Sequence, residues 1–341
     1  MLNTLKLKLK RIFPFYIKHK VKRLLMSTNF TAYNMVRLEA STICQLNCKA
    51  CYMRINNYGV VGKGYLKFED FKRFVDNNKF IKNIELSNSG EIFLNPDLIE
   101  ILKYAYSKNV LLTADNGVNF NNVSDEMIEA LVKYKLYSLT FSIDGASQEV
   151  YEKYRVNGNF NKVIDNIKKL QHYKEKYNSK YPLLTWQYII MKGNDSENDI
   201  IAVKNIAKEL NIKMYFRFTW ETNYKPANPE IIEKETGLKY WKEQETLATM
   251  NPSAYSNVCY QLWYNPQINY DGRLLGCCIV YKDDFGINVF DVGLKKALKS
   301  KNFAYTKKML QGKVPPPKDK TNIPCANCEY YHNMLATKKF I

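Results

Sequence analysis

The chain has 341 residues, of which 46% are hydrophobic and 14% aromatic, so it can bury a sizeable core and global disorder is excluded. Its formal net charge is +18, and nine of these charges come from the Lys and Arg residues between Lys6 and Arg37, because no acid precedes Glu39. No apolar run approaches the roughly 20 residues that span a bilayer, and the Leu–Lys alternation of residues 5–10 lacks the apolar stretch of a signal peptide. We therefore expect a cytoplasmic protein, in which eight cysteines indicate metal binding rather than disulfides.

The first 34 residues predict one or two short basic amphipathic helices, interrupted at Pro14. From residue 35 onward, short apolar strands alternate with helical patterns. The predicted strands are 35–40, 83–87, 110–113, 138–143, 184–191 and 213–218, and the predicted helices are 68–80, one opened by Pro96 and Asp97, 125–134, 160–177 and 197–210. Six such repeats indicate a parallel α/β domain over residues 35–220, either an open sheet or a curved partial barrel, with its active site at the carboxyl ends of the strands.

The pattern changes after this domain. Residues 221–254 predict a connecting region with one helix near 240–247. The final segment, 255–341, is loop-rich, has a hairpin signal at Asp271-Gly272 and holds five of the eight cysteines. A small segment with few regular elements commonly needs a metal to fold.

Cys44, Cys48 and Cys51 stand at CxxxCxxC spacing directly after the first predicted strand. Three thiolates on one short loop can ligate three of the four irons of a cubane cluster and leave the fourth iron open, as a catalytic metal site requires. A zinc loop with its fourth ligand elsewhere is the alternative interpretation.

This loop resembles the signature of the radical S-adenosylmethionine (SAM) superfamily, whose fold is a partial (β/α)6 barrel similar to a TIM barrel. The resemblance implies a catalytic [4Fe–4S] cluster whose fourth iron is chelated by SAM, and a 5′-deoxyadenosyl radical that removes a hydrogen atom from the substrate. It also implies a flavodoxin- or ferredoxin-type electron donor. The residue before the last cysteine is commonly aromatic in the family but is Ala50 here, which either weakens the contact with adenine or transfers it to Tyr52.

Further family-like motifs follow in order along the chain. Ser89-Gly90-Glu91 resembles the Gly-Gly-Glu motif that holds the methionine amine of SAM, and Asn116-Gly117 resembles an Asn-Gly turn of the family. By the same resemblance, Ser142 and Asp144 are placed to bond ribose hydroxyls, and Arg155 to pair with the methionine carboxylate. Each motif alone is more typical of a turn, a cap or a solvated helix residue, but together, in register with predicted strand ends, they favour the family.

The C-terminal cysteines resemble the SPASM extension and its shorter twitch form, which hold auxiliary iron–sulfur clusters. The resemblance implies one auxiliary [4Fe–4S] cluster with four ligands, namely Cys259, Cys277, Cys325 and Cys328. Cys278 is expected to point to the other face of its strand as a bystander, although its exchange with Cys277 stays open. A structural four-cysteine zinc site is the alternative.

This layout most resembles twitch-bearing dehydrogenases that oxidise an amino-cyclitol, so our main hypothesis is oxidation of a small-molecule or glycan-type alcohol, with the auxiliary cluster accepting an electron. No general base can be identified. The candidates to face substrate are Gln187, Tyr188, Arg217 and Glu221, and helix or core roles are equally open for them. The alternative is a radical SAM maturase that modifies a peptide or protein. Many such enzymes carry an N-terminal recognition domain larger than the segment that precedes the first strand here, which counts against this alternative.

The basic segment 1–34 allows three interpretations. It covers the bottom of the barrel, or it lies on an anionic membrane surface at about 1 kcal/mol per nearby Lys or Arg, or it contacts RNA. The second would suit a lipid-linked glycan, and the third is disfavoured because aromatic stacking motifs are not apparent. A hypothesis of another class, a zinc-stabilised nucleic-acid-binding protein, explains the charge but not the ordered motifs, so nucleic acid is not an expected partner.

Overall fold

The structure is a computed structural model that describes residues 34–219, 222–239, 258–279 and 283–341. Eight strands form one sheet in the order β6-β5-β4-β3-β2-β1-β7-β8. They are β1 Met35–Leu38, β2 Asn83–Glu85, β3 Leu111–Val118, β4 Ser138–Ser142, β5 Leu183–Ile190, β6 Lys213–Phe218, β7 Gln267–Ile268 and β8 Leu274–Gly276. In this sheet order, each pair of adjacent strands from β6 through β1 to β7 is parallel, and only β8 runs antiparallel to its neighbour β7. The expected parallel α/β class is confirmed, and the sheet extends beyond the six predicted strands.

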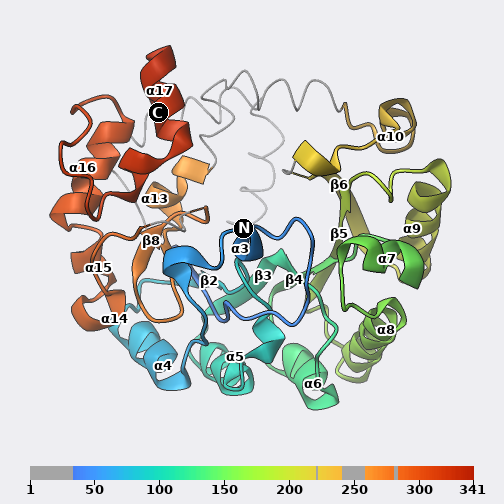
Figure 1. Cartoon of the computed structure of the whole chain (residues 1–341). Helices are drawn as coiled ribbons and strands as arrows, with labels where there is room; N and C mark the ends of the chain where they lie inside the picture. The colour runs from blue at the N-terminus through green and yellow to red at the C-terminus, as the bar shows by residue number, and fades with distance from the viewer. Residues whose placement is uncertain (1–33, 220–221, 240–257, 280–282) are drawn as a thin grey trace, which may run out of the picture.

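Helices follow the strands and cover one side of the sheet. The longer ones are α4 Phe68–Asn77, α5 Leu98–Ser107, α6 Asp125–Lys133, α7 Gln148–Tyr154, α8 Phe160–Lys176, α9 Glu197–Glu209, α10 Pro229–Thr236, α16 Lys301–Leu310 and α17 Glu329–Thr337. The short ones are α3 Tyr52–Ile55, α13 Gln261–Tyr264, α14 Val289–Val292 and α15 Leu294–Ala297. Figure 1 shows α4, α5, α6, α8 and α9 along the outer side of a sheet that curves into an open arc.

Side-chain alternation explains which face of each strand meets the helices. In β1, Val36 and Leu38 are fully buried in the main core, and Leu112 and Ala114 of β3 are buried in the same core. Successive side chains of a strand point to opposite faces, so Arg37 lies on the other face of β1, toward the inside of the arc. The core therefore lies between sheet and helices, and the interior of the barrel is lined by polar side chains.

The C-terminal segment joins the same sheet. β7 pairs with β1 in the register Arg37↔Gln267, and the β7–β8 connection confirms the predicted hairpin, with Gly272 at a φ of +88°. Beyond the hairpin, Phe285 packs edge-on against Phe303 of α16 with ring centroids 4.9 Å apart. The segment thus combines a strand pair of the barrel sheet with a small helical layer of its own.

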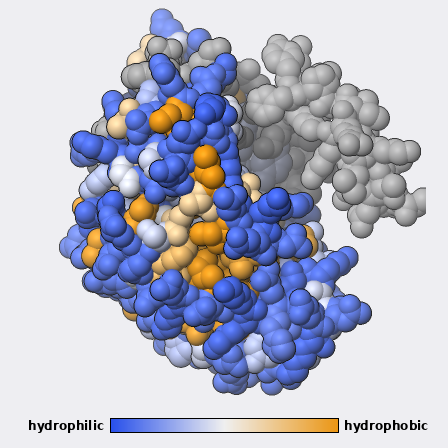
Figure 2. All heavy atoms as spheres, turned by 90° about the vertical axis from the view of Figure 1, so that its right-hand side faces the viewer, coloured by the Kyte–Doolittle hydropathy of each residue, from blue (hydrophilic) through white to orange (hydrophobic). Residues whose placement is uncertain are grey.

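The helices predicted in the basic N-terminal segment and near residues 240–247 lie outside the described residues. Figure 2 shows a largely hydrophilic surface with apolar atoms gathered in the middle of the face that is at the right of Figure 1. Ile201 of α9 is one of the exposed large hydrophobic side chains, with 40% of its surface accessible. In the part of the chain that is described, no helix has both the length and the apolar character needed to cross a bilayer.

Candidate active site

The loop after β1 is fixed by backbone hydrogen bonds to two other loops. It carries the predicted catalytic ligands Cys44, Cys48 and Cys51. The Glu91 N–H donates to the carbonyl of Ile43 at 2.8 Å, and the Asn47 N–H donates to the carbonyl of Val156 at 2.9 Å. The loop is therefore held between the segments that follow β2 and α7.

Two nitrogen donors point at the sulfurs of this loop. Arg155 Nη1 lies 3.7 Å from the Sγ of Cys48, and Asn119 Nδ2 lies 3.5 Å from the Sγ of Cys44. Burial, and after it the negative charge of nearby Glu91, raises the pKa of the Cys44 thiol to about 12. Burial also raises the pKa of Cys48, while the positive charge of Arg155 opposes this rise.

These features fit a [4Fe–4S] cluster. Hydrogen-bond donors directed at cysteine sulfurs stabilise the negative charge of a thiolate-bound cluster. Among the residues that the structure describes, no three His, Cys, Asp or Glu side chains converge on a point that could hold a single metal ion. A cubane does not require such convergence, because each cysteine binds a different iron.

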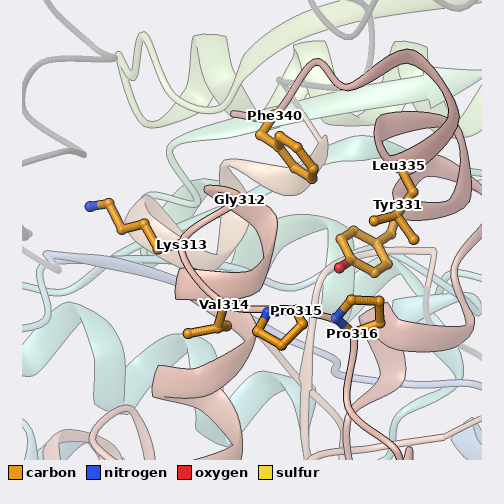
Figure 3. A pocket seen from close by; sticks show the side chains of 8 residues that line it. All are labelled: Gly312, Lys313, Val314, Pro315, Pro316, Tyr331, Leu335 and Phe340. Atoms are coloured by element: carbon orange, nitrogen blue, oxygen red, sulfur yellow. The ribbon is translucent and has the colours of Figure 1, made fainter.

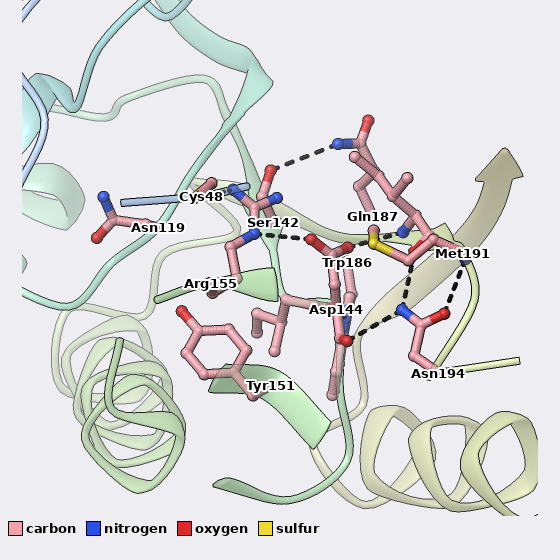
Figure 4. Close-up of polar contacts among 12 residues, drawn as sticks. Cys48, Asn119, Ser142, Asp144, Tyr151, Arg155, Trp186, Gln187, Met191 and Asn194 are labelled. Carbon is pink, nitrogen blue, oxygen red and sulfur yellow. Dashed lines mark hydrogen bonds and ion pairs between the residues drawn. The ribbon is translucent and has the colours of Figure 1, made fainter. Parts of the chain in front are cut away.

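Arg155 lies between the cysteine loop and a buried carboxylate, as Figure 4 shows. Its Nε is 2.7 Å from Asp144 Oδ2, and Asp144 Oδ1 accepts the Ile189 N–H at 2.7 Å. Asp144 is fully buried, and its two oxygens contact Arg155 and Ile189, so it is the counter-ion that orients Arg155. Arg155, expected to meet the methionine carboxylate, directs its Nη1 toward Cys48.

The Ser89-Gly90-Glu91 segment packs directly against the chain that leads to the cysteines. A Cβ atom on Gly90 would lie 2.4 Å from the carbonyl oxygen of Ser41, so only glycine fits. Glu91 is 1% exposed and its carboxylate accepts the Asn119 N–H at 2.6 Å, which ties the loops after β2 and β3 together. Burial raises the pKa of Glu91 to about 7.

The remaining predicted SAM contacts fall into two places. Gly117 has a φ of +113°, and a Cβ there would lie 2.1 Å from the Oγ of Ser142, so the Asn116-Gly117 turn and Ser142 are immediate neighbours. Tyr52, at the start of α3, is 38% exposed, and its hydroxyl donates to the carbonyl of Ile279 at 3.4 Å. The first group lies at the ends of β3 and β4, and Tyr52 lies beside the C-terminal segment.

The structure brings the four predicted auxiliary ligands together from distant positions. Cys259, Cys277 and Cys325 are buried and Cys328 is partly buried. Burial raises the pKa of each thiol, and each of the first three is also affected by the charge of at least two other C-terminal cysteines. The Sγ of Cys278 accepts a hydrogen bond at 3.2 Å from Nε2 of Gln261, the first residue of α13. This contact fixes the Cys278 sulfur beside that helix.

Two of the four substrate-facing candidates line the inside of the barrel. Arg217 Nη1 and the Tyr215 hydroxyl both donate to Gln187 Oε1, at 3.3 and 2.7 Å. Tyr188 takes the core role that the sequence left open: it is fully buried on the helix-covered face, since it alternates with Gln187 along β5. Glu221 lies outside the described residues.

Among the charged residues of the barrel interior that were not singled out from the sequence, three lie on or next to β1 and β3. Arg37 and Glu39 belong to β1 and the residue after it, and Asp115 belongs to β3. The signal that could have found the first two is their alternation with the buried residues Val36 and Leu38.

A hollow of about 300 Å³ lies in the C-terminal segment and contains none of these site residues. Figure 3 shows its lining, which joins the loop after α16 to α17 and the chain end; the residues are Gly312, Lys313, Val314, Pro315, Pro316, Tyr331, Leu335 and Phe340. It is mostly apolar and carries no group suited to radical or metal chemistry.

Comparison with known proteins agrees with the site. Residues 38–185 match the model of the Radical SAM superfamily. Residues 38–185 therefore form a radical SAM domain, a family that implies a [4Fe–4S] cluster and SAM as cofactors.

Three similar proteins define how far the likeness extends. The AdoMet-dependent heme synthase of Methanosarcina barkeri is 29% identical over 143 residues, which are 41% of this chain and 40% of that protein. The cysteine-type anaerobic sulfatase-maturating enzyme of Clostridium novyi is 25% identical over 268 residues, covering 74% of this chain and 64% of that protein. The structure of Streptococcus suis SuiB bound to S-adenosylmethionine has a TM-score of 0.61 at 14% identity, and covers 91% of this chain and 72% of SuiB. The chain thus spans less than two thirds of both curated relatives, and the likeness to SuiB shows the fold alone.

Proposed function

We propose that this chain is a maturase that uses radical SAM chemistry to modify a residue of a peptide or protein. The observation that carries the proposal is the extent of the likeness to the sulfatase-maturating enzyme. It spans 268 residues, whereas the matched radical SAM domain, 38–185, spans 148, so the likeness extends well beyond the domain. The SuiB fold, which this chain shares, has also been solved bound to the precursor peptide SuiA.

In this proposal the chain's own residues hold and orient the cofactors. Cys44, Cys48 and Cys51 ligate the catalytic cluster, and Arg155 and Asn119 donate hydrogen bonds to its cysteine sulfurs. The proposed SAM-contacting residues are Tyr52, Ser89, Gly90, Glu91, Asn116, Ser142, Asp144 and Arg155. Cluster and SAM, when bound, supply the means to abstract a hydrogen atom from the substrate.

The four C-terminal cysteines are proposed to hold an auxiliary [4Fe–4S] cluster. Their burial excludes water from the metal, and four protein ligands leave no iron open to substrate. Such a centre is suited to electron transfer rather than to substrate binding. A flavodoxin- or ferredoxin-type protein is the proposed electron donor to the enzyme.

Iron analysis of the anaerobically reconstituted chain tests both metal sites. About eight irons per chain are expected if both sites hold cubanes. Replacing Cys44, Cys48 and Cys51 by Ala should remove about half of this iron and abolish release of 5′-deoxyadenosine. The matched control is Cys278→Ala, which should keep the full iron content. Protein that is loaded with zinc and lacks iron would contradict the proposal.

The substrate class is tested by hydrogen transfer. The reconstituted enzyme is incubated with SAM, a strong reductant and random-sequence peptides, or with amino-cyclitols in their place, and 5′-deoxyadenosine is quantified by mass spectrometry. Peptides should stimulate its release and show a mass change on a residue. Stimulation by cyclitols and not by peptides would instead favour oxidation of a sugar or cyclitol alcohol, which stays a prediction that no comparison supports.

A further inference from the structure

The interior of the barrel is polar, and its charges are unevenly compensated. Glu85 is 3% exposed, and its carboxylate accepts hydrogen bonds from the hydroxyls of Ser87 and Thr113 and the backbone N–H of Asp115. This acid is therefore satisfied by the protein itself. Arg37, on the neighbouring strand, is in a different situation.

The Arg37 guanidinium is held by neutral oxygens. Its Nη1 donates to Asn88 Oδ1 and its Nη2 to Asn116 Oδ1, each at 3.1 Å. No carboxylate of the described residues forms an ion pair with it, although Asp115 lies near enough to feel its charge. Amide oxygens fix the plane of the guanidinium but leave its positive charge in place.

Two further donors beside this guanidinium have no partner within the described structure. Arg37 Nε and Asn116 Nδ2 are both buried and both lack an acceptor. They belong to two side chains that are hydrogen-bonded to each other, so they lie in one place. A positive charge beside two unpartnered N–H donors is complementary to a carboxylate, because a carboxylate is negatively charged and only accepts hydrogen bonds.

We propose that Arg37 and Asn116 form a carboxylate-binding site inside the barrel, which holds an acidic group of the substrate next to the SAM motifs. This inference rests on the proposed function, and it specifies the substrate as a peptide with an Asp or Glu side chain, or a free C-terminus, close to the modified residue. Asn88 lies on the loop that carries Ser89-Gly90-Glu91, and Asn116 lies in the Asn-Gly segment of β3, so the site adjoins the predicted SAM contacts.

The competing interpretation is that Arg37 merely ties the loops after β2 and β3 together. A purely structural role is fulfilled by the hydrogen bonds of Arg37 Nη1 and Nη2. It requires neither the positive charge of the guanidinium nor the unpartnered donors. Burial raises the pKa of nearby Glu39 to about 7, so this carboxyl is only partly ionised near neutral pH and is a weak counter-charge. The two interpretations therefore predict different effects of removing the charge.

Selection from a peptide library distinguishes them. The anaerobically reconstituted enzyme with SAM is mixed with random decapeptides bearing free or amidated C-termini, and bound peptides are identified by mass spectrometry. We expect the bound pool to be enriched about tenfold in Asp, Glu or free C-termini relative to the pool bound by Arg37→Met. Arg37→Lys, which keeps a charge but loses the planar fork, should show an intermediate enrichment.

Arg73→Met is the matched control, because it removes the same charge from the exposed side of α4. It should bind acidic peptides as the unmodified chain does. An equal share of acidic peptides in the pools bound by the unmodified chain, Arg37→Met and Arg73→Met would assign the acid preference to the net charge of +18 and overturn the site. SAM affinity is measured in parallel in Arg37→Met, and a loss of SAM affinity as large as the loss of acid preference would assign the donors to the cofactor and also overturn the site.

A second readout separates failure of this site from failure of the proposed function. If no peptide binds, the peptide proposal fails, and the site is judged by arginine footprinting with a phenylglyoxal reagent. Glutarate should then slow modification of Arg37 several-fold and leave Arg73 unaffected. Equal rates with and without glutarate would refute the carboxylate site.

Discussion

Glu39 gives the sharpest prediction about stability. Its side chain is 1% exposed, and burial raises the pKa of the carboxyl from 4.5 to about 7, although the backbone N–H groups of Ser89 and Asn88 donate to it at 3.1 and 3.2 Å. Because the folded-state pKa is the higher one, the folded chain binds more protons than the unfolded chain between these two values. The free energy of unfolding therefore falls as the pH rises from about 4.5 to about 7, and the cost persists above that range.

The magnitude follows from the size of this pKa change. One pKa unit corresponds to about 1.4 kcal/mol, so the cost is roughly 1 kcal/mol near pH 5.5 and roughly 3 kcal/mol near pH 8. Glu39→Gln removes the titration, and its amide can donate to Gln267 Oε1, a buried acceptor that has no partner within the described structure. Relative to the unmodified chain, the variant should gain about 2 kcal/mol between these pH values.

Urea unfolding under anaerobic conditions, followed by circular dichroism from about pH 5.5 to pH 8, measures this difference. Glu100→Gln, an exposed Glu on α5, controls for the chemical change itself. Parallel stability curves for Glu39→Gln and the unmodified chain would refute the reasoning, because they would mean that the Glu39 carboxyl ionises equally readily in both states.

Three other substitutions test packing around the site. In Gly90→Ala the new Cβ would lie 2.4 Å from a backbone carbonyl oxygen of the segment before the cysteines, so we expect a loss of about 1–3 kcal/mol in urea unfolding and less iron at the catalytic site; full iron retention would argue against a close fit. Asp144→Ala leaves Arg155 buried without its counter-ion and should cost about 3–5 kcal/mol by the same measurement, whereas a change below about 1 kcal/mol would show that the pair is not needed. In Gly272→Ala the new Cβ would lie 2.3 Å from a side-chain oxygen, whereas in Gly237→Ala, at a similar positive φ, it would meet open space. Gly272→Ala should therefore lower the thermal midpoint of unfolding more than Gly237→Ala does. Equal shifts would show that backbone strain alone determines the loss.

The repeating part of the fold could be predicted because each strand carries apolar residues on its helix-covered side. β7 could not, since it contains only Gln267 and Ile268 and is defined by pairing with β1, far earlier in the chain. β3 was predicted to end at Thr113 but continues to Val118. Its last residues include Asn116-Gly117, which is typical of a turn, but pairing with β4 resumes at Val118 after a register shift.

The cysteine loop and the motif positions could be found because their signal is spacing along the chain. The partners of those residues could not, because they depend on how separate segments fold together. Asp144 meets Arg155 only because α7 lies between them and returns the chain to the cysteine loop. Arg37 carries no motif at all, and its environment depends on two asparagines, one in the loop after β2 and one in β3.

The predicted boundary between the barrel and the C-terminal segment divides the sequence but not the contacts around the site. Gln267 of β7 lies 3.4 Å from the Glu39 carboxylate, and Asn88 Nδ2 donates to the carbonyl of Cys278 at 3.3 Å. Asn88 is also the residue that holds Arg37. The segment that brings the C-terminal cysteines together is therefore linked by short polar contacts to the group proposed to hold the substrate. β7 also pairs directly with β1 in the same sheet. We therefore expect a change in either the barrel or the C-terminal segment to alter the shape of the barrel interior.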